Sequence, residues 1–373
     1  MNKICFLIGN YNNSGGTERV TSQIANGLAE NGYDISIISI EKGMSPHFET
    51  HSRVKLFELD HTDRFVDKTP SNRLLRKVKF RLWSLRKISA IKKSFVNVIK
   101  DIAPDLVIAV DIQCYRIIDP YRNKYHYKTV GWEHFSLLVK SGLGYSYSRY
   151  LATKHASKIL VLSDNDLHDY QAKYPKARNL MRLHNPLAFK PSRNSDMSNK
   201  VVIAAGRYAR QKNFVALIEA WNKIGKDNQG WELRIFGDGE DKEKLQALID
   251  KYKLINAKLM PYTKHLEEEM NKASIYALSS SYEGWGLVLI EAQAKGLPCV
   301  SFNCKHGPSE IITDGVNGYL VTPNDTGEFA EKLLKLMKND ELRQFFSDNA
   351  QKDLYKFDIN FVIDQWIEML DSI

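Results

Sequence analysis

The sequence predicts an α/β protein of two Rossmann-like domains, and three observations support this class. Short apolar runs alternate with longer helical patterns along all 373 residues. The two halves open alike, because Ile4 to Gly9 and Val201 to Gly206 are each an apolar run that ends in a glycine ahead of a helical pattern. The length suits two domains of roughly 150 residues each. Two such first strands indicate two separate doubly wound sheets.

The individual strands are expected at the apolar runs. In the first half these are ICFLIG, ISIISI, VKLFEL, DLVIAV and KILVLS, and in the second they are VVIAAG, ELRIFG, AKLMPY, SIYALSS and PCVSF. Continuous apolar strands separated by amphipathic helices are typical of parallel sheets that are covered on both faces. We therefore expect one such sheet in each half.

The domain boundary is predicted at Asn185–Pro186, ahead of the polar stretch KPSRNSDMSNK. The closing segment FDINFVIDQWIEML has apolar residues at helical spacing, and it is expected to pack onto the first domain because these residues need a core. They are Phe361, Ile363, Trp366, Ile367 and Leu370. The predicted domains are residues 1–185 and 186–355, followed by a terminal helix in 356–373.

Composition excludes several classes of protein. Hydrophobic residues at 43% and charged residues at 26% describe a globular chain. No apolar stretch approaches the roughly 20 residues that cross a bilayer, and the N-terminus is expected to form a strand rather than a signal peptide. Four cysteines without a CxxC pair or a Cys/His cluster indicate reduced thiols in a cytoplasmic protein. The net charge of +9 favours an anionic partner without identifying it.

Glycine turns follow both first strands. Gly15 and Gly16 precede a predicted helix, whose free N–H groups suit a phosphate, although a tight turn explains the same glycines equally well. In the second half, Gly206 is followed by Arg207 and then by Lys212, where the next helix is predicted to begin. These two cations can converge on one diphosphate. Solvated surface cations are the alternative, but open α/β sheets bind ligands at the carboxyl ends of their strands.

The strongest motif is EGWGLVLIEA, which starts at Glu283 directly after the run SIYALSS. Glu283 lies in a glycine-flanked loop and Glu291 lies eight residues on, inside a predicted helix, so both can point into one cleft. Carboxylates accept hydrogen bonds from sugar and ribose hydroxyls, and loop glycines expose backbone N–H groups. An ordinary capped helix does not need this combination.

The motifs follow one order along the chain: GGTER, the strand end at His134, Asn185–Pro186, GRxxxQKN, FGDG, the two-glutamate motif and GLPCVSFNCKHGPSEIITDGVNGYLV. In this order they resemble the retaining family four glycosyltransferases over nearly the whole chain. That family has the GT-B architecture, which implies two Rossmann-like domains with a deep cleft between them. The stretch CKHGPSEII resembles members that add galactose, N-acetylgalactosamine or glucose in bacterial capsule, lipopolysaccharide and other surface glycans. The resemblance implies transfer of a hexose or N-acetylhexosamine from a UDP-sugar to a glycan or lipid-linked acceptor.

The resemblance also implies roles for single residues. Arg207 and Lys212 would hold the donor diphosphate and neutralise it as it leaves. Glu291 would bind the ribose and Glu283 the transferred sugar. His134 matches the active-site histidine that lies against the donor sugar, whereas by itself a histidine at a strand end is more often a structural hydrogen-bonder. The other implied donor contacts are Gly15, Gly16, Gly206, Gly237, Pro261, Tyr262, Gly284, Trp285, Gly286 and Leu287.

The resemblance also implies retention of the anomeric configuration, which two routes could give: a double displacement through a carboxylate, or attack on the face from which the leaving group departs. The second is the usual proposal for the family that the sequence resembles. Such a route needs preorganised charge more than a nucleophile, so no covalent nucleophile is predicted. No carboxylate cluster suited to a metal is evident, since Asp164 and Asp166 are expected to cap a following helix. We therefore expect no metal and no cofactor, with Arg207 and Lys212 acting in place of a divalent ion.

Residues 64 to 100 are expected to form a basic amphipathic helix. Such a helix suits an anionic membrane surface, at about 1 kcal/mol for each Lys or Arg near the lipid. The predicted membrane-binding residues are Arg73, Arg76, Lys77, Lys79, Arg81, Trp83, Arg86 and Lys87. The protein would then be peripheral on the inner face of the cell membrane, where lipid-linked acceptors are found. A solvated helix face is the alternative, and nucleic acid is not expected because no aromatic stacking platform accompanies the charge.

Three other functions compete with glycosyl transfer. A nicotinamide-dependent oxidoreductase is disfavoured because no GxGxxG follows either first strand. A non-catalytic protein that binds nucleotide sugars or membrane surfaces is the stronger rival, since binding residues alone do not prove turnover. A nucleotide-sugar epimerase would be favoured by a changed sugar without an acceptor.

Overall fold

The computed structural model describes residues 1–43, 45–62, 73–137, 142–192, 195 and 197–373, without the side chains of 73–79 and 81. Contacts divide the chain into two compact units. The first unit is Met1–Leu162, Asp166–Pro186 and Ile359–Ile373, and the second is Ser163–Asn165 and Leu187–Asp358. The sequence placed its boundaries at Asn185–Pro186 and at residue 356, and the contact division falls after Pro186 and after Asp358.

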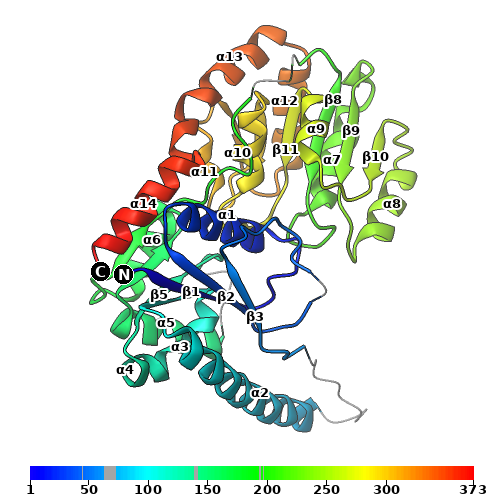
Figure 1. Ribbon diagram of the computed structural model, residues 1–373. Coiled ribbons are helices and arrows are strands. Elements are labelled where there is room, and N and C mark those ends of the chain that lie inside the picture. Colours follow the sequence, from blue (N-terminus) through cyan, green and yellow to red (C-terminus); the bar gives the residue numbers. More distant parts are fainter. Residues whose placement is uncertain (44, 63–72, 138–141, 193–194, 196) are drawn as a thin grey trace. The chain divides into compact units, whose positions relative to one another are not determined.

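The first unit is built on a parallel sheet with the strand order β3-β2-β1-β4-β5-β6-β7 (Figure 1). Its strands are β1 (Lys3–Ile8), β2 (Asp34–Ser39), β3 (Lys55–Glu58), β4 (Leu106–Val110), β5 (Lys128–Trp132), β6 (Lys158–Val161) and β7 (Leu180–Arg182). The central strands β1 and β4 are buried, as their continuous apolar runs predict. The run VKLFEL behaves differently, because β3 lies at the edge of the sheet and is mostly exposed.

The helices of the first unit connect successive strands, except for the C-terminal helix α14. They are α1 (Gly16–Glu30), α2 (Arg73–Ile102), α3 (Tyr115–Ile118), α4 (Arg122–Tyr125), α5 (Leu143–His155), most of α6 (Asp164–Lys173) and α14 (Ile359–Asp371), with 3₁₀ turns at Ile112–Cys114 and Asp119–Tyr121. The expectation that Asp164 and Asp166 precede a helix as caps was wrong, because both lie inside α6. Helix α2 is anchored by Ile91, Phe95 and Ile99, which are buried at a spacing of four residues.

The terminal helix α14 packs within the first unit. Trp366 is fully buried, with its ring 4.7 Å from that of Trp132 in an edge-on arrangement. Ile363 lies so close to α1 that a methyl group added at Gly27 would be 2.5 Å from it. The predicted inward position of Phe361 was wrong, since this ring is 39% exposed. Ile367 is only partly buried, while the inward positions that the prediction missed are Val362 and Met369.

The second unit is built on a parallel sheet with the order β10-β9-β8-β11-β12-β13 (Figure 1). Its strands are β8 (Val201–Ala205), β9 (Glu232–Phe236), β10 (Ala257–Met260), β11 (Ile275–Leu278), β12 (Cys299–Phe302) and β13 (Gly318–Val321). Its helices are α7 (Phe214–Ile224), α8 (Lys242–Lys251), α9 (Leu266–Asn271), α10 (Leu287–Ala294), α11 (Pro308–Ile311), α12 (Thr326–Met337) and α13 (Asp340–Ala350), with 3₁₀ turns at Gly225–Asn228 and Gln351–Phe357. Among the described helices, none is long and apolar enough to cross a membrane.

The start of α7 differs from the prediction. The helix was expected from Lys212, but it begins at Phe214. Asn213 precedes it with φ of 49°, a left-handed conformation that interrupts the helix. Lys212 therefore lies in the loop that follows β8, which leaves its backbone carbonyl free to accept a bond from another loop.

Candidate functional site

Two loops of the second unit meet at the carboxyl edge of its sheet. β8 and β11 are neighbours, so the segments that follow them, 206–213 and 279–286, are adjacent. The N–H of Ser281 donates to the carbonyl of Gln211 at 2.9 Å, and the hydroxyl of Ser279 donates to the carbonyl of Lys212 at 2.8 Å. The side-chain amide of Gln211 donates to the carbonyl of Tyr282 at 3.1 Å. These bonds hold the two predicted donor-binding motifs together.

Lys212 and Glu283 form an ion pair at this junction. The Lys212 ammonium lies 2.7 Å from Glu283 Oε1, and the two side chains are 18% and 8% exposed. The Ser280 hydroxyl donates to the same oxygen at 2.5 Å. Sequence reasoning missed Ser280, although its place three residues before Glu283 at a strand end was a usable signal. The arrangement fixes one ammonium and one carboxylate, at known orientations, where a ligand of an open α/β sheet would bind.

Glu291, the second glutamate of the motif, lies on α10. Its side chain is buried, and α10 begins after Gly286, which has φ of 90° and contributes no side-chain cap. Glycine allows this left-handed turn, and the first N–H groups of the helix face its open end. Burial raises the pKa of Tyr276 well above its usual value of 10, and both Glu291 and Glu283 raise it further through their charge. The charges of both glutamates therefore act on the same buried phenol.

Arg207 stands apart from the ion pair. Its side chain is 73% exposed and lies 3.0 Å from the carboxylate of Glu240. Lys212 instead pairs with Glu283, so the structure does not bring the two predicted diphosphate cations onto one partner. An exposed pair of this kind contributes little to stability, and a ligand can displace it at small cost.

The loop after β9 packs closely on the loop after β8. A methyl group added at Gly237 would lie 2.0 Å from the carbonyl oxygen of Gly206, so glycine is required for this contact. The Tyr208 hydroxyl lies 2.7 Å from the carbonyls of both Ile235 and Met260. Pro261 and Tyr262 follow directly after β10 and are exposed. Three successive strand ends, those of β8, β9 and β10, therefore carry predicted donor contacts side by side.

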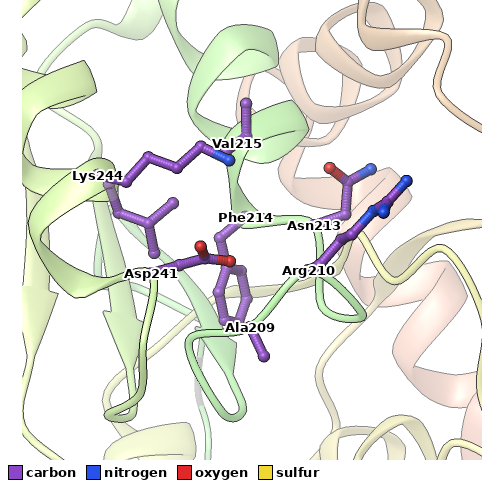
Figure 2. Close-up of a pocket in the computed structure, with 8 residues that line it drawn as sticks. Ala209, Arg210, Asn213, Phe214, Val215, Asp241 and Lys244 are labelled. Carbon is purple, nitrogen blue, oxygen red and sulfur yellow. The ribbon is translucent and has the colours of Figure 1, made fainter. Parts of the chain in front are cut away.

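A cavity of about 310 Å³ lies next to the loop that follows β8. Figure 2 shows the residues that line it. The ring of Phe214 and the carboxylate of Asp241 face it, while the ammonium of Lys244 lies near Val215. The full lining is Ala209, Arg210, Asn213, Phe214, Val215, Asp241, Lys244 and Leu245. None of these is a predicted site residue, although the cavity borders the loop that carries Lys212.

In the first unit, the carboxylate of Glu18 lies against the glycine turn that precedes α1. α1 begins after Gly15 without a side-chain cap, and a methyl group added at Gly15 would lie 2.4 Å from a carboxylate oxygen of Glu18. The N–H groups of Gly15 and Glu18 bond this carboxylate and lower its pKa, against a larger upward shift from burial. A phosphate near Gly15 and Gly16 would have to compete with Glu18.

His134 lies two residues beyond β5, at the carboxyl edge of the first sheet. Its ring is 6% exposed and packs at 4.3 Å from the ring of Trp132. Burial lowers the pKa of His134 to about 3, so the imidazole is neutral at pH 7. Among the described residues, no hydrogen-bond partner reaches its Nε2. A purely structural role, in which hydrogen bonds hold the histidine, therefore does not explain the position of Nε2.

The basic helix α2 falls partly outside the described residues. The backbone is helical from Arg73, whereas residues 64–72 of the predicted segment and the side chains of Arg73, Arg76, Lys77, Lys79 and Arg81 lie outside the description. Described exposed groups include Phe80, Leu82, Leu85 and Arg86. The Lys87 ammonium lies 5.1 Å above the Trp83 ring. Apolar and cationic groups thus share the described start of α2.

In the described part of the chain, one group of three potential metal ligands lies close together: His265, Glu267 and Glu268. His265 and Glu268 are exposed, and acidic surface groups of this kind are common without a metal. They lie at the start of the short helix α9, away from the ion pair of Lys212 and Glu283 in the sequence.

Known proteins with similar sequences are glycosyltransferases. A family model described as "Glycosyl transferases group 1" matches residues 188–353. An "Uncharacterized glycosyltransferase" from Haemophilus influenzae is 30% identical over 98% of this chain and 99% of its own length. The "Amylovoran biosynthesis glycosyltransferase AmsD" of Erwinia amylovora is 28% identical over the whole of both chains. A Campylobacter jejuni N-acetyl-D-galactosaminyltransferase, whose named substrate is a glycan on PP-undecaprenol, is 24% identical over 100% of this chain and 99% of its own.

Solved structures share the fold. Anabaena Alr3699/HepE, in complex with UDP and glucose, superposes with a TM-score of 0.79 over 100% of both chains at 19% identity. This likeness covers both sheets, and it confirms the predicted pair of Rossmann-like halves in the GT-B architecture.

Proposed function

The chain belongs to the group 1 glycosyl transferases, and from this premise we propose that it transfers a hexose or N-acetylhexosamine from a UDP-sugar, with retention, onto a bacterial surface glycan or a lipid-linked precursor. The observation that carries the proposal is the ion pair of Lys212 and Glu283 at the carboxyl edge of the second sheet, in a motif that also holds the buried Glu291. The named activities of relatives that act on amylovoran and on an undecaprenol-linked glycan support the acceptor class.

The donor site follows from charge and hydrogen bonding. Lys212 is a fixed cation for the diphosphate, and Arg207 can leave Glu240 to join it, since that pair is exposed. Glu291 would accept hydrogen bonds from the ribose and Glu283 from the sugar. The open start of α10 adds N–H groups for the same ligand. That HepE binds UDP and glucose supports a uridine nucleotide as the donor.

The transfer step requires no protein nucleophile. The bond between the sugar C1 and the phosphate oxygen breaks, and UDP leaves with the electron pair. The acceptor oxygen forms a bond to C1 on the same face, and its proton passes to a leaving phosphate oxygen. Lys212 and Arg207 stabilise the negative charge that develops on the diphosphate. Glu283 already accepts bonds from Lys212 and Ser280, which suits it to orient hydroxyls rather than to attack C1.

We propose that this transfer requires no metal ion and no cofactor. The cations proposed to contact the diphosphate, Lys212 and Arg207, are protein side chains at the carboxyl edge of the sheet, which supports this assignment. Turnover unchanged by a chelator is the expected result, and restoration of lost activity by Mg²⁺ or Mn²⁺ would contradict it.

We further propose that α2 places the protein on the cytoplasmic face of an anionic membrane. Exposed Phe80, Leu82 and Leu85 beside Arg86 and Lys87 combine apolar area with positive charge, which is the pattern of interfacial helices. Co-sedimentation with vesicles of phosphatidylglycerol and phosphatidylethanolamine tests this. Neutralising Arg86, Lys87 and the basic residues from 73 to 81 should release the protein, while neutralising lysines of α8 should not. Equal binding by both variants would contradict the proposal that α2 binds the membrane.

Turnover separates this proposal from a protein that only binds nucleotide sugars. Purified protein would be incubated with UDP-glucose, UDP-galactose, UDP-N-acetylglucosamine and UDP-N-acetylgalactosamine, and free UDP would be measured. Slow hydrolysis of at least one donor is expected, together with its loss in Glu283→Ala. Glu243→Ala, on the exposed face of α8, is the matched control and should retain the activity. UDP binding without turnover of any donor would favour the binding protein.

A further inference from the structure

Arg149 holds both ends of the segment that carries His134. Its Nε donates to Glu133 Oε2 at 2.9 Å, and its Nη1 donates to the carbonyl of Leu137 at 3.2 Å. Arg149 belongs to α5 and is fully buried. The backbone from Glu133 to Leu137 is therefore tied to one helix at its start and at its end, and His134 lies between the two attachments.

Tyr170 completes the attachment from a second helix. Its hydroxyl, on α6, donates to Glu133 Oε2 at 2.5 Å, and Arg149 Nε lies 3.2 Å from the Tyr170 oxygen. All three side chains are at most 2% exposed. A fully buried ion pair is a poor means of gaining stability, because the loss of hydration offsets much of the attraction. The bonds among these groups still fix one arrangement of the backbone around them, although Glu133 Oε1 has no hydrogen-bond partner among the described residues.

The His134 ring packs against a neighbouring ring on one side, and its buried Nε2 has no hydrogen-bond partner among the described residues. The Trp132 ring packs on it, and Trp132 in turn packs on Trp366. Within the described residues no bond of its own orients Nε2, although a buried polar atom without a partner costs free energy. The direction of this nitrogen must therefore be imposed by the backbone that carries the ring and by the Trp132 contact.

We propose that Glu133, Arg149 and Tyr170 are positioning residues that fix the orientation of the His134 imidazole for glycosyl transfer. The three act through His134 and touch no substrate themselves. The proposal rests on the function proposed above and on the family resemblance of the sequence, which implies that His134 lies against the donor sugar.

The test compares two tyrosines. Tyr170→Phe removes one bond to Glu133 and leaves the ring in place. Tyr127→Phe is the matched control, because Tyr127 is equally buried in the same unit and donates to the carbonyl of Ile118 at 2.6 Å, outside the network. Both variants should fold with similar losses in Tm. For hydrolysis of the UDP-sugar that the wild type cleaves best, Tyr170→Phe should lower kcat about tenfold with little change in KM, since misplacement acts on the transition state. Tyr127→Phe should change neither.

A double-mutant cycle shows whether the effect passes through His134. In a His134→Ala background, Tyr170→Phe should lower kcat no further. An undiminished loss in that background, or no loss in the wild-type background, would overturn the proposal.

A readout without activity keeps the two proposals separate. In protein labelled with ¹⁵N-histidine, the ring signals of His134, assigned with His134→Gln, should move in Tyr170→Phe and stay in place in Tyr127→Phe. If the wild type cleaves no UDP-sugar, the proposed function fails, and these signals still decide whether the network orients His134. Unmoved signals in Tyr170→Phe would refute the positioning role.

Discussion

Replacing Glu283 by glutamine should tighten UDP binding while it lowers turnover. The Lys212 ammonium lies 2.7 Å from Glu283 Oε1. A phosphate oxygen that contacts this ammonium from the opposite side would lie roughly 5 Å from the carboxylate, where two unit negative charges repel by about 0.8 kcal/mol even at the dielectric constant of water. Two phosphate charges give roughly 1.5 kcal/mol, which is about a tenfold lower Kd for UDP in the variant.

The substitution keeps the shape of the site. Glutamine retains an oxygen that can accept from Ser280 and Lys212, so we expect a loss in the free energy of unfolding of about 1 to 2 kcal/mol. Turnover should fall by about a hundredfold or more, because a neutral amide binds sugar hydroxyls less strongly than a carboxylate during transfer.

Isothermal titration with UDP provides the assay, at two salt concentrations because the effect is electrostatic. Glu243→Gln is the control, since it removes the same charge from an exposed position on α8. Weaker or unchanged UDP binding by Glu283→Gln would show that Glu283 does not compete for Lys212, and it would refute the proposed geometry of the donor site.

Three further predictions concern stability and the supporting structure. With a pKa of about 3 in the folded state against the ordinary 6.5, His134 takes up a proton on unfolding below pH 6.5, so its contribution to stability is lost as the pH falls. Between pH 7 and 5 the wild type should lose about 2 kcal/mol more than His134→Gln in urea unfolding, and parallel losses would contradict a buried neutral ring. Gly237→Ala should cost about 1 to 3 kcal/mol and weaken UDP binding, because its methyl group meets the neighbouring carbonyl at 2.0 Å, whereas Gly9→Ala meets nothing within 4 Å and should do neither. Trp366→Ala should cost about 3 to 5 kcal/mol through the cavity left beside Trp132, and a change below 1 kcal/mol in thermal or urea unfolding would show that α14 does not contribute to the first core.

The sheets were predictable because parallel strands buried on both faces are continuous apolar runs. The run at β8, VVIAA, is buried throughout, and its glycine and cations follow at the predicted end. Burial could not be predicted for an edge strand or for every apolar residue of a helix. The strand β3 has a similar run but lies at an edge, and Phe361 continues the apolar pattern of α14 yet faces outward. Neither fact is encoded in local spacing, since both depend on what packs against the element.

The candidate site was predictable as a set of motifs and less so as a set of contacts. Carboxyl ends of parallel strands share an edge, so motifs far apart in the chain could be expected near one another. The ion pairs that these side chains form were not predictable. Lys212 bonds Glu283, 71 residues away, rather than acting with Arg207, which pairs with Glu240. The network that surrounds Glu133 was missed because its members come from a strand end and two separate helices, and no spacing signals that they meet.

Hydrogen exchange with and without UDP tests most directly whether the second unit binds a nucleotide at this edge. UDP should slow exchange in peptides that cover 204–214 and 280–292, and it should leave peptides from α13 unchanged. Protection confined to other parts of the chain, or no protection at saturating UDP, would contradict the account.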